Sequence, residues 1–224
     1  MQAVGEDPAA ILTRASHPPA VAEFFPEVPM YPTFILPGLN GSPDGHWQRH
    51  WAKERSSSSV VEQEDWSCPV LEDWQAELDR ALSQTEGAFL VAHSLGCLLA
   101  ASYAGRSLAA KIRGALLVAP CSLAVTLQLH PCMIEFGEEP LSRLPFPSLV
   151  VGSLNDPYMS VPDIERHIRS WGSELVTIGF AGHINVASGF GRWDEGYRFF
   201  ERLRRAADEA SGRTRGAVPL VRTA

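Results

Sequence analysis

The fold is decided by residues 88–104, which read AFLVAHSLGCLLAASYA. Residues 89–92 form a short apolar run of the kind found in a strand that is buried on both faces. Residues 97–104 are small and apolar and are compatible with a helix, and Ser94 lies between the two segments. The stretch therefore predicts a buried strand, a sharp turn that carries Ser94, and a helix.

The turn matches the nucleophile-elbow pattern G-x-S-x-G, with Ala92 in place of the first glycine. A sharp strand-to-helix turn needs small residues on both sides of the serine, because bulky side chains would collide with the neighbouring strand. Ala92 and Gly96 meet this need. The turn would expose the Ser94 hydroxyl and direct the free N–H groups of the helix at a reacting group. Since such patterns also arise by chance, the interpretation depends on an acid and a histidine further along the chain.

Length and charge limit the classes of function. A chain of 224 residues is long enough for one well-buried α/β domain and too short for two comfortable ones. The formal net charge of −7 argues against binding to nucleic acid or to an anionic membrane surface. No apolar run approaches the roughly 20 residues of a membrane span. We therefore expect a small-molecule substrate rather than nucleic acid or membrane, and the oligomeric state stays open.

The cysteines indicate a reducing environment. The four of them are widely scattered and have neither zinc-ligand spacing nor the density of a disulfide scaffold: Cys68, Cys97, Cys121 and Cys132. The first residues lack the basic and apolar segments of a signal peptide. No glycine-rich loop fits a phosphate group. We expect a cytoplasmic protein with reduced thiols and no metal ion.

The chain divides into an irregular, proline-rich arm at residues 1–30, a domain at residues 31–209 and a flexible tail at residues 210–224. Apolar runs predict strands at 33–36, 60–63, 89–92, 114–119, 148–152 and 174–178, and helical spacing predicts helices at 46–51, 69–84, 97–104, 162–171 and 194–209. This alternation predicts a doubly wound, mainly parallel sheet of about six strands with helices on both faces. Residues 121–145 show no clean period and are expected to form a lid or pocket wall.

Polar residues follow the predicted strands at the edge where such sheets bind ligands. Asp156 follows one strand and precedes Pro157, and His183 follows the next in a glycine-containing turn. The order Ser94, Asp156, His183 is that of an α/β-hydrolase. His183 could take the Ser94 proton and return it to the leaving group, while Asp156 orients the imidazole. Activity should then fall as this imidazole takes up a proton at low pH.

The oxyanion hole should combine the backbone N–H of Leu95 with one from the loop after the first strand, where Leu39 is the first choice and Asn40 the second. Residues 121–145 contain apolar side chains that suggest a modest hydrophobic acyl pocket: Leu123, Val125, Leu127, Leu129, Met133, Ile134 and Phe136. The candidate pocket residues are Asn40, His46, His93, Met133, Phe136 and Tyr158.

Simpler interpretations stay open for these residues. Asp156 could be a turn former, and His183 a packed polar residue. Asp163 is a rival acid, but its place at the start of a predicted helix favours a capping role. His46 and His93 are expected to shape the pocket rather than to react.

Several segments together resemble the small serine hydrolases related to retinoblastoma-binding protein 9 and the bacterial YdeN-type proteins. They are Leu36-Pro37-Gly38 with His46-Trp47, the elbow, Asn155-Asp156-Pro157-Tyr158, Ala181-Gly182-His183-Ile184-Asn185, and Ser188-Gly189-Phe190-Gly191 with Trp193. The resemblance covers about residues 33–204. It implies a minimal α/β-hydrolase fold without a large cap domain, the triad Ser94, Asp156 and His183, and no cofactor. It does not supply a substrate.

Three functional hypotheses follow. The first is a serine hydrolase that cleaves small carboxylic esters, or amides or thioesters, through an acyl-enzyme on Ser94. The second is a catalytically weak binding or scaffold protein that retains the fold. The third is a different reaction on the same fold, such as that of a cofactor-free lyase or perhydrolase. The complete set of Ser94, Asp156 and His183 favours the first, and an active-site serine probe separates it from the second.

Overall fold

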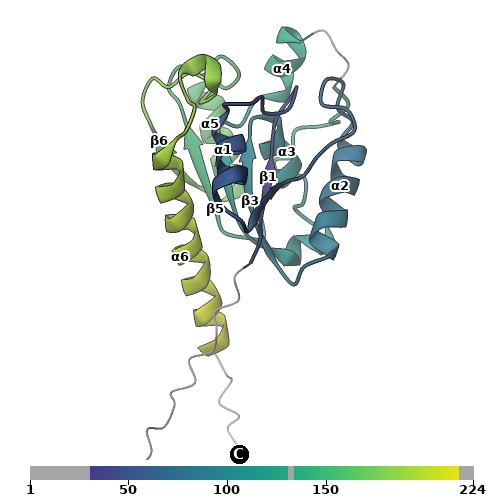
Figure 1. Ribbon diagram of the computed structural model, residues 1–224, viewed down its shortest axis with the longest axis vertical. Helices are drawn as coiled ribbons and strands as arrows, with labels where there is room; N and C mark the ends of the chain where they lie inside the picture. The colour runs from purple at the N-terminus through teal and green to yellow at the C-terminus, as the bar shows by residue number, and fades with distance from the viewer. Residues whose placement is uncertain (1–30, 131–133, 217–224) are drawn as a thin grey trace, which may run out of the picture.

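The computed structural model describes residues 31–130 and 134–216, which form one six-stranded sheet with helices on both faces (Figure 1). All strands are parallel, in the order β2-β1-β3-β4-β5-β6. The strands are β1 Thr33–Leu36, β2 Ser58–Val60, β3 Ala88–His93, β4 Ile112–Val118, β5 Ser148–Gly152 and β6 Glu174–Thr177. The order runs from β1 outward to the edge strand β2 and then back across β1 to β3 and on to β6, which confirms the predicted doubly wound sheet.

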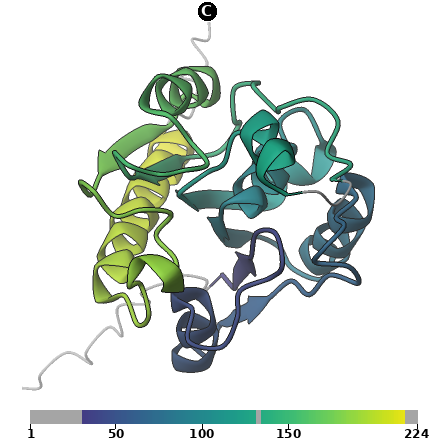
Figure 2. The same cartoon turned by 90° about the horizontal axis from the view of Figure 1, so that it is seen from above.

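The helices cover the sheet in two layers. They are α1 Trp47–Glu54, α2 Leu71–Ser83, α3 Leu95–Ala101, α4 Leu123–Leu129, α5 Val161–Trp171 and α6 Asp194–Gly216, with short 3₁₀ turns η1 Ser107–Lys111 and η2 Val186–Ser188. Helices α1 and α6 pack on one face, and α2, α3 and α5 pack on the other (Figure 2). Within the described residues, no helix combines the length and apolar character that crossing a membrane requires.

The central strand β3 explains why residues 89–92 are continuously apolar. All six of its residues are buried. Phe89 and Val91 join the core under α1 and α6, whereas Leu90 and Ala92 join the core under α2, α3 and α5. Because side chains alternate between the faces and both faces are covered, neither set can be polar.

Three elements differ most from the sequence prediction, while others shift by a few residues at their ends. Strand β2 is an edge strand that ends at Val60 rather than beginning there. Helix α6 continues to Gly216, past the predicted end at residue 209. The apolar stripe from which its end was predicted stops at Ala207, and the last turns lie beyond it. Helix α4 lies in the segment expected to be irregular, where the buried polar Thr126 interrupts the apolar period. Residues 1–30 and 217–224 lie outside the described residues, as does most of the predicted tail.

Backbone strain is concentrated at the carboxyl edge of the sheet. In the part of the chain that the structure describes, four residues other than glycine have positive φ: Asn40, Ser94, Ala119 and Ile184. They follow β1, β3, β4 and β6, respectively. Such conformations persist where the surrounding structure enforces them, and they often occur at functional sites. The same edge also carries the residues that the sequence singled out.

Candidate active site

Ser94 lies at a sharp turn between β3 and α3, with φ 53° and ψ −122°. The turn is packed backbone against backbone. A Cβ atom on Gly96 would lie 2.2 Å from the Leu36 carbonyl oxygen, and one on Gly38 would lie 2.7 Å from the Ser94 Cβ. Both positions therefore need glycine, and the loop after β1 lies directly against the turn.

Ser94, His183 and Asp156 form a hydrogen-bonded chain across three strand ends. The Ser94 Oγ lies 2.9 Å from the His183 Nε2, and the His183 Nδ1 lies 2.9 Å from each carboxylate oxygen of Asp156. The His183 and Asp156 side chains are only 8% and 2% exposed. A proton on Nδ1 that is donated to Asp156 leaves Nε2 free to accept the Ser94 hydroxyl proton.

The loops that carry Asp156 and His183 are joined by polar side chains. The Asn155 Oδ1 accepts hydrogen bonds from the Ser153 hydroxyl at 2.9 Å and from the Gly182 N–H at 2.8 Å. The Ser153 Oγ accepts one from the Ala181 N–H at 3.0 Å. These bonds fix the loop after β5 to the loop after β6, and so fix Asp156 relative to His183.

The backbone N–H groups of Leu39 and Leu95, close to Ser94, have no hydrogen-bond partner among the described residues. The Asn40 N–H, in contrast, donates to the Trp66 carbonyl oxygen at 2.7 Å. A Cβ on Gly38 would lie 3.2 Å from the Leu95 nitrogen, so the two segments adjoin. Of the two sequence candidates in the loop, only Leu39 has a free donor.

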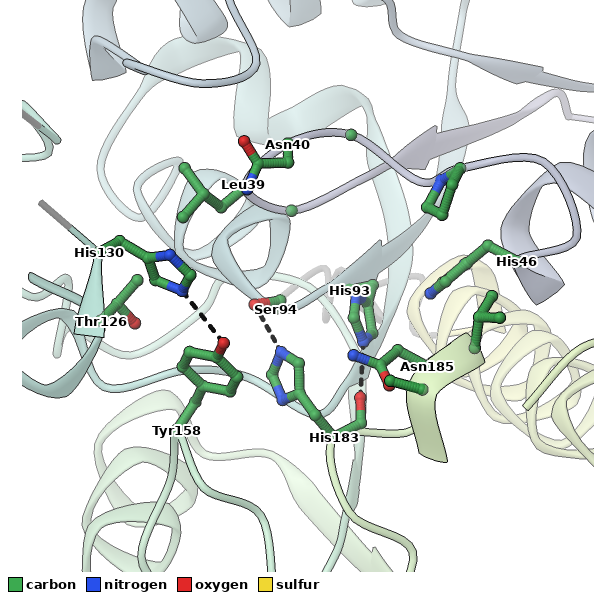
Figure 3. A pocket seen from close by; sticks show the side chains of 15 residues that line it. Leu39, Asn40, His46, His93, Ser94, Thr126, His130, Tyr158, His183 and Asn185 are labelled. Carbon is green, nitrogen blue, oxygen red and sulfur yellow. Dashed lines mark hydrogen bonds between the residues drawn. The ribbon is translucent and has the colours of Figure 1, made fainter. Parts of the chain in front are cut away.

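A cleft of about 560 Å³ opens over Ser94. Its lining comprises Gly38, Leu39, Asn40, Gly41, Pro43, His46, His93, Ser94, Thr126, His130, Tyr158, His183, Asn185, Val186 and Ala187. Figure 3 shows His130 and Tyr158 on one side of Ser94, with His46 and Asn185 on the other. Among these described lining residues there is no Lys, Arg, Asp or Glu. The volume is in the range of small-ligand sites.

The serine hydrolase family model matches residues 33–202. The chain belongs to this family of serine hydrolases. A crystal structure described as a YdeN-like hydrolase from Pectobacterium atrosepticum is 33% identical over 80% of this chain and 89% of that one, with a TM-score of 0.64. The YdeN product of B. subtilis is 21% identical over 77% and 98% of the two chains, also with a TM-score of 0.64.

More distant structures share the fold. A monoacylglycerol lipase from Paleococcus ferrophilus is 14% identical over 79% of this chain and 95% of that one, with a TM-score of 0.54. Among curated protein sequences, none matches this chain. The family match and the two YdeN structures show that the protein is an enzyme of the YdeN type with the α/β-hydrolase fold. They confirm the resemblance drawn from the sequence.

Two further histidines of the hydrolase are held neutral beside Ser94. The His46 Nδ1 accepts the Gln48 N–H at 3.2 Å and so caps α1, and burial lowers the pKa of His46 to about 4. The His93 Nε2 donates to the His183 carbonyl oxygen at 2.9 Å, and burial also holds the pKa of His93 well below its usual value. Both rings are uncharged at neutral pH, and His93 connects the elbow to the His183 loop.

The structure places four of the six predicted pocket residues in the cleft: Asn40, His46, His93 and Tyr158. The expectation for Phe136 is wrong. Its ring packs in the core against Trp74, with ring centroids 5.3 Å apart. Met133 lies outside the described residues.

The described residues of 121–145 do not form the expected apolar acyl pocket. Among its described residues, that segment contributes Thr126 and His130 to the cleft instead. Leu123 is buried in the core, and Leu127 is exposed. The reason is helix α4, on which residues four apart share a face. The spacing of Thr126 and His130 was the signal that could have identified them. Asn185, Val186 and Ala187 were also missed.

Asp163 takes the role that the sequence favoured for it. Its N–H donates to the Ser160 Oγ at 3.2 Å, and its carboxylate accepts the Ser160 hydroxyl at 2.5 Å. This reciprocal pair stabilises the start of α5.

Neither thiols nor metal ligands add chemistry to the described site. Cys97 and Cys121 are buried, and burial raises the pKa of Cys121 to about 11 and that of Cys97 well above its usual value. Thiols of this kind stay protonated and unreactive. Within residues 31–130 and 134–216, no three His, Cys, Asp or Glu side chains are grouped so that they could hold a metal ion.

Proposed function

We propose that this enzyme hydrolyses small, uncharged carboxylic esters through an acyl-enzyme on Ser94, with amides or thioesters as alternative substrates of the same chemistry. The observation that carries the proposal is the continuous hydrogen-bonded chain from the Ser94 Oγ through His183 to Asp156, with both spacings at 2.9 Å. Folding alone does not account for this chain of hydrogen bonds, because a buried serine at the start of a helix needs neither a histidine nor a carboxylate beside it.

The reaction proceeds in two halves. His183 Nε2 takes the Ser94 hydroxyl proton as the Oγ attacks the ester carbonyl carbon, and the carbonyl electron pair moves onto the oxygen. His183 then gives this proton to the departing alkoxide, which leaves an acyl group on Ser94. Water repeats the sequence on the acyl-enzyme and releases the acid. Asp156 holds the Nδ1 proton throughout and stabilises the imidazolium.

The negative oxygen of each tetrahedral intermediate is bound by the N–H groups of Leu39 and Leu95. The Asn40 N–H does not serve, because it is already donated to Trp66. One such donor is typically worth about 10²–10³ in rate. Its effect is largest where water is excluded, and Ser94 and Leu95 are both buried.

The lining of the cleft supports the substrate class. Because no Lys, Arg, Asp or Glu lines it among the described residues, the cleft offers a charged substrate no oppositely charged Lys, Arg, Asp or Glu side chain. Thr126, His130 and Tyr158 provide hydrogen-bonding groups on one side of Ser94 (Figure 3). The Tyr158 hydroxyl is already paired with the His130 Nε2 at 3.0 Å. A short or moderately polar acyl group fits this side better than a long alkyl chain.

Labelling with a fluorophosphonate probe, read by intact mass, tests the proposal together with turnover of p-nitrophenyl esters from acetate to octanoate. We expect one adduct on the wild type and none on Ser94→Ala. Turnover should fall by at least about 10⁴-fold in Ser94→Ala. In Asp156→Asn it should fall by about 10⁴-fold, because the imidazole is then held in the wrong tautomer.

Ser102→Ala is the matched control, since Ser102 follows the end of the same helix α3 and bonds to Gln75 rather than to the site. It should label and turn over like the wild type. A folded wild type that gives no adduct would contradict the proposal and favour the binding-protein alternative. A maximal rate with octanoate would contradict the substrate class.

A further inference from the structure

Gln48 is a fully buried polar residue in the first turn of α1, away from the cleft lining. Its side-chain amide makes three hydrogen bonds. The Nε2 donates to the Leu36 carbonyl oxygen and to the Val91 carbonyl oxygen, each at 3.1 Å. The Oε1 accepts the Ser42 hydroxyl at 2.6 Å. Both donor hydrogens of the amide are therefore engaged.

These partners lie at the bases of two segments that meet at Ser94. Leu36 is the last residue of β1, and the chain runs from it through Gly38 to Leu39. Val91 is in β3, three residues before Ser94. Ser42 lies further along the loop that carries Leu39. The Gln48 amide thus links three places. It holds the end of β1, from which the chain runs to the Leu39 N–H, and it holds β3, from which the chain runs to the Leu95 N–H. It also holds Ser42, at the far end of the loop that carries Leu39.

We propose that Gln48 is a positioning residue that sets the spacing of the Leu39 and Leu95 N–H groups, and so forms the oxyanion hole. This inference rests on the proposed function, because it assigns a task to the donors of that mechanism. Gln48 does not touch the substrate. It acts by holding the two backbone segments in register, where contact between Gly38 and the turn leaves no spare room.

The chemistry of the amide explains why another buried residue would not serve. An apolar side chain of similar volume would leave two carbonyl groups and a hydroxyl unpaired in the core, which is unfavourable. A carboxylate would place negative charge against two carbonyl oxygens. Only a carboxamide of this length offers two donors and an acceptor at once.

The test compares Gln48→Met and Gln48→Glu with the wild type on p-nitrophenyl acetate, with rates per titrated Ser94. We expect kcat and kcat/KM to fall together by about 10²-fold, because loss of alignment affects only the transition state. Affinity for a trifluoromethyl ketone, whose Ser94 adduct carries the same oxyanion, should fall in the same proportion. The midpoint of the acid limb of the pH–rate profile should not move, since His183 and Asp156 are untouched.

Ser42→Ala gives a milder variant that removes only the 2.6 Å bond to the Oε1. It should lower kcat and ketone affinity in the same direction by a smaller factor, and it decides the question if the Gln48 variants do not fold. Gln75→Met is the matched control. Gln75 also makes two amide hydrogen bonds, to Ser102 and Arg106, but at the end of α3 opposite Ser94. It should leave kcat and ketone affinity unchanged.

The outcomes separate this inference from the function on which it rests. Unchanged kcat and ketone affinity in Gln48→Met or Ser42→Ala, in an enzyme whose turnover depends on Ser94, would overturn the role of Gln48 and leave the proposed function intact. A shifted acid limb would also overturn it, by placing the effect on His183. Wild-type turnover that does not depend on Ser94 would overturn both.

Discussion

The two sides of the cleft are held together by different means. On the elbow side, residues 36–41 and 92–97, backbone packs on backbone, with glycine at the contact points and the buried Gln48 amide behind them. On the loop side, residues 153–158 and 179–188, the Ser153 and Asn155 side chains join two surface turns by hydrogen bonds, and the Ser188 Oγ accepts the His183 N–H within the second turn. The first arrangement has no space for an added atom. We expect the second to keep its shape when one bond is lost.

This difference matches the tasks proposed for the two sides. Oxyanion donors act through fixed backbone positions, so the segments that carry them need rigid packing. A general base has to exchange protons with both the serine and a leaving group, and small changes in its loop are tolerable. We therefore expect substitutions at the packed glycines of the elbow side to affect mainly folding, and those on the loop side to affect mainly rate.

The largest effect is expected for Gly96→Ala. The new methyl group would lie 2.2 Å from the Leu36 carbonyl oxygen and 2.6 Å from that of Pro37, so β1 or α3 has to move. Since backbone cannot rotate away as a side chain does, we expect a loss of at least about 4 kcal/mol in the free energy of unfolding. Urea unfolding followed by circular dichroism measures it.

Gly212→Ala is the control for this substitution. It lies in α6 with nothing within 4 Å of the added Cβ, so the replacement should be neutral or stabilising by up to about 1 kcal/mol. A Gly96→Ala protein as stable as the wild type would show that the elbow side is as adaptable as the loop side.

Features with a local signal in the sequence could be predicted. Strands β1 and β5 have the predicted bounds, because an apolar run between turn residues is a local signal. The sequence predicts that Ser94, Asp156 and His183 meet, because the carboxyl ends of parallel strands share one edge. In the structure, the His183 ring lies 2.9 Å from the Ser94 Oγ and 2.9 Å from the Asp156 carboxylate.

Features that depend on tertiary contacts could not be predicted in this way. Helix α4 is short, and its buried Thr126 disguises the apolar period. Phe136 looked like a pocket residue because nothing local distinguishes an apolar side chain in a wall from one in the core. Gln48 is an ordinary helix residue in the sequence, and only its three distant partners reveal its place.

A pH-dependent stability is expected from His46, whose ring lies against that of His93 on the elbow side. Burial lowers the pKa of His46 from 6.5 to about 4. The unfolded chain therefore binds more protons between these values, and the free energy of unfolding falls as the pH drops from about 6.5 to about 4. His46→Asn keeps a good N-cap and removes this titration. From pH 7 to 4 it should lose less stability than the wild type, by about 3 kcal/mol.

Urea unfolding at pH 4, 5, 6, 7 and 8 provides the comparison. The pH 8 value is the internal control, because His46 is then neutral in both the folded and unfolded states, and only the capping difference remains. Parallel curves for the two proteins across this range would mean that the ring is not buried as the structure has it.

The smallest effect is expected for Asn155→Ala on the loop side. The change removes the acceptor for the Ser153 hydroxyl and the Gly182 N–H. Because Asn155 is exposed, water can replace it, and stability should fall by only about 1 kcal/mol. Turnover should fall by less than about 10²-fold, as His183 loses part of its alignment with Ser94. Asn155→Asp keeps the acceptor oxygen and should retain more stability than Asn155→Ala. If Asn155→Ala instead destabilised the protein as strongly as Gly96→Ala, the loop side would be as rigid as the elbow side, and His183 would depend on the same close packing as the oxyanion donors.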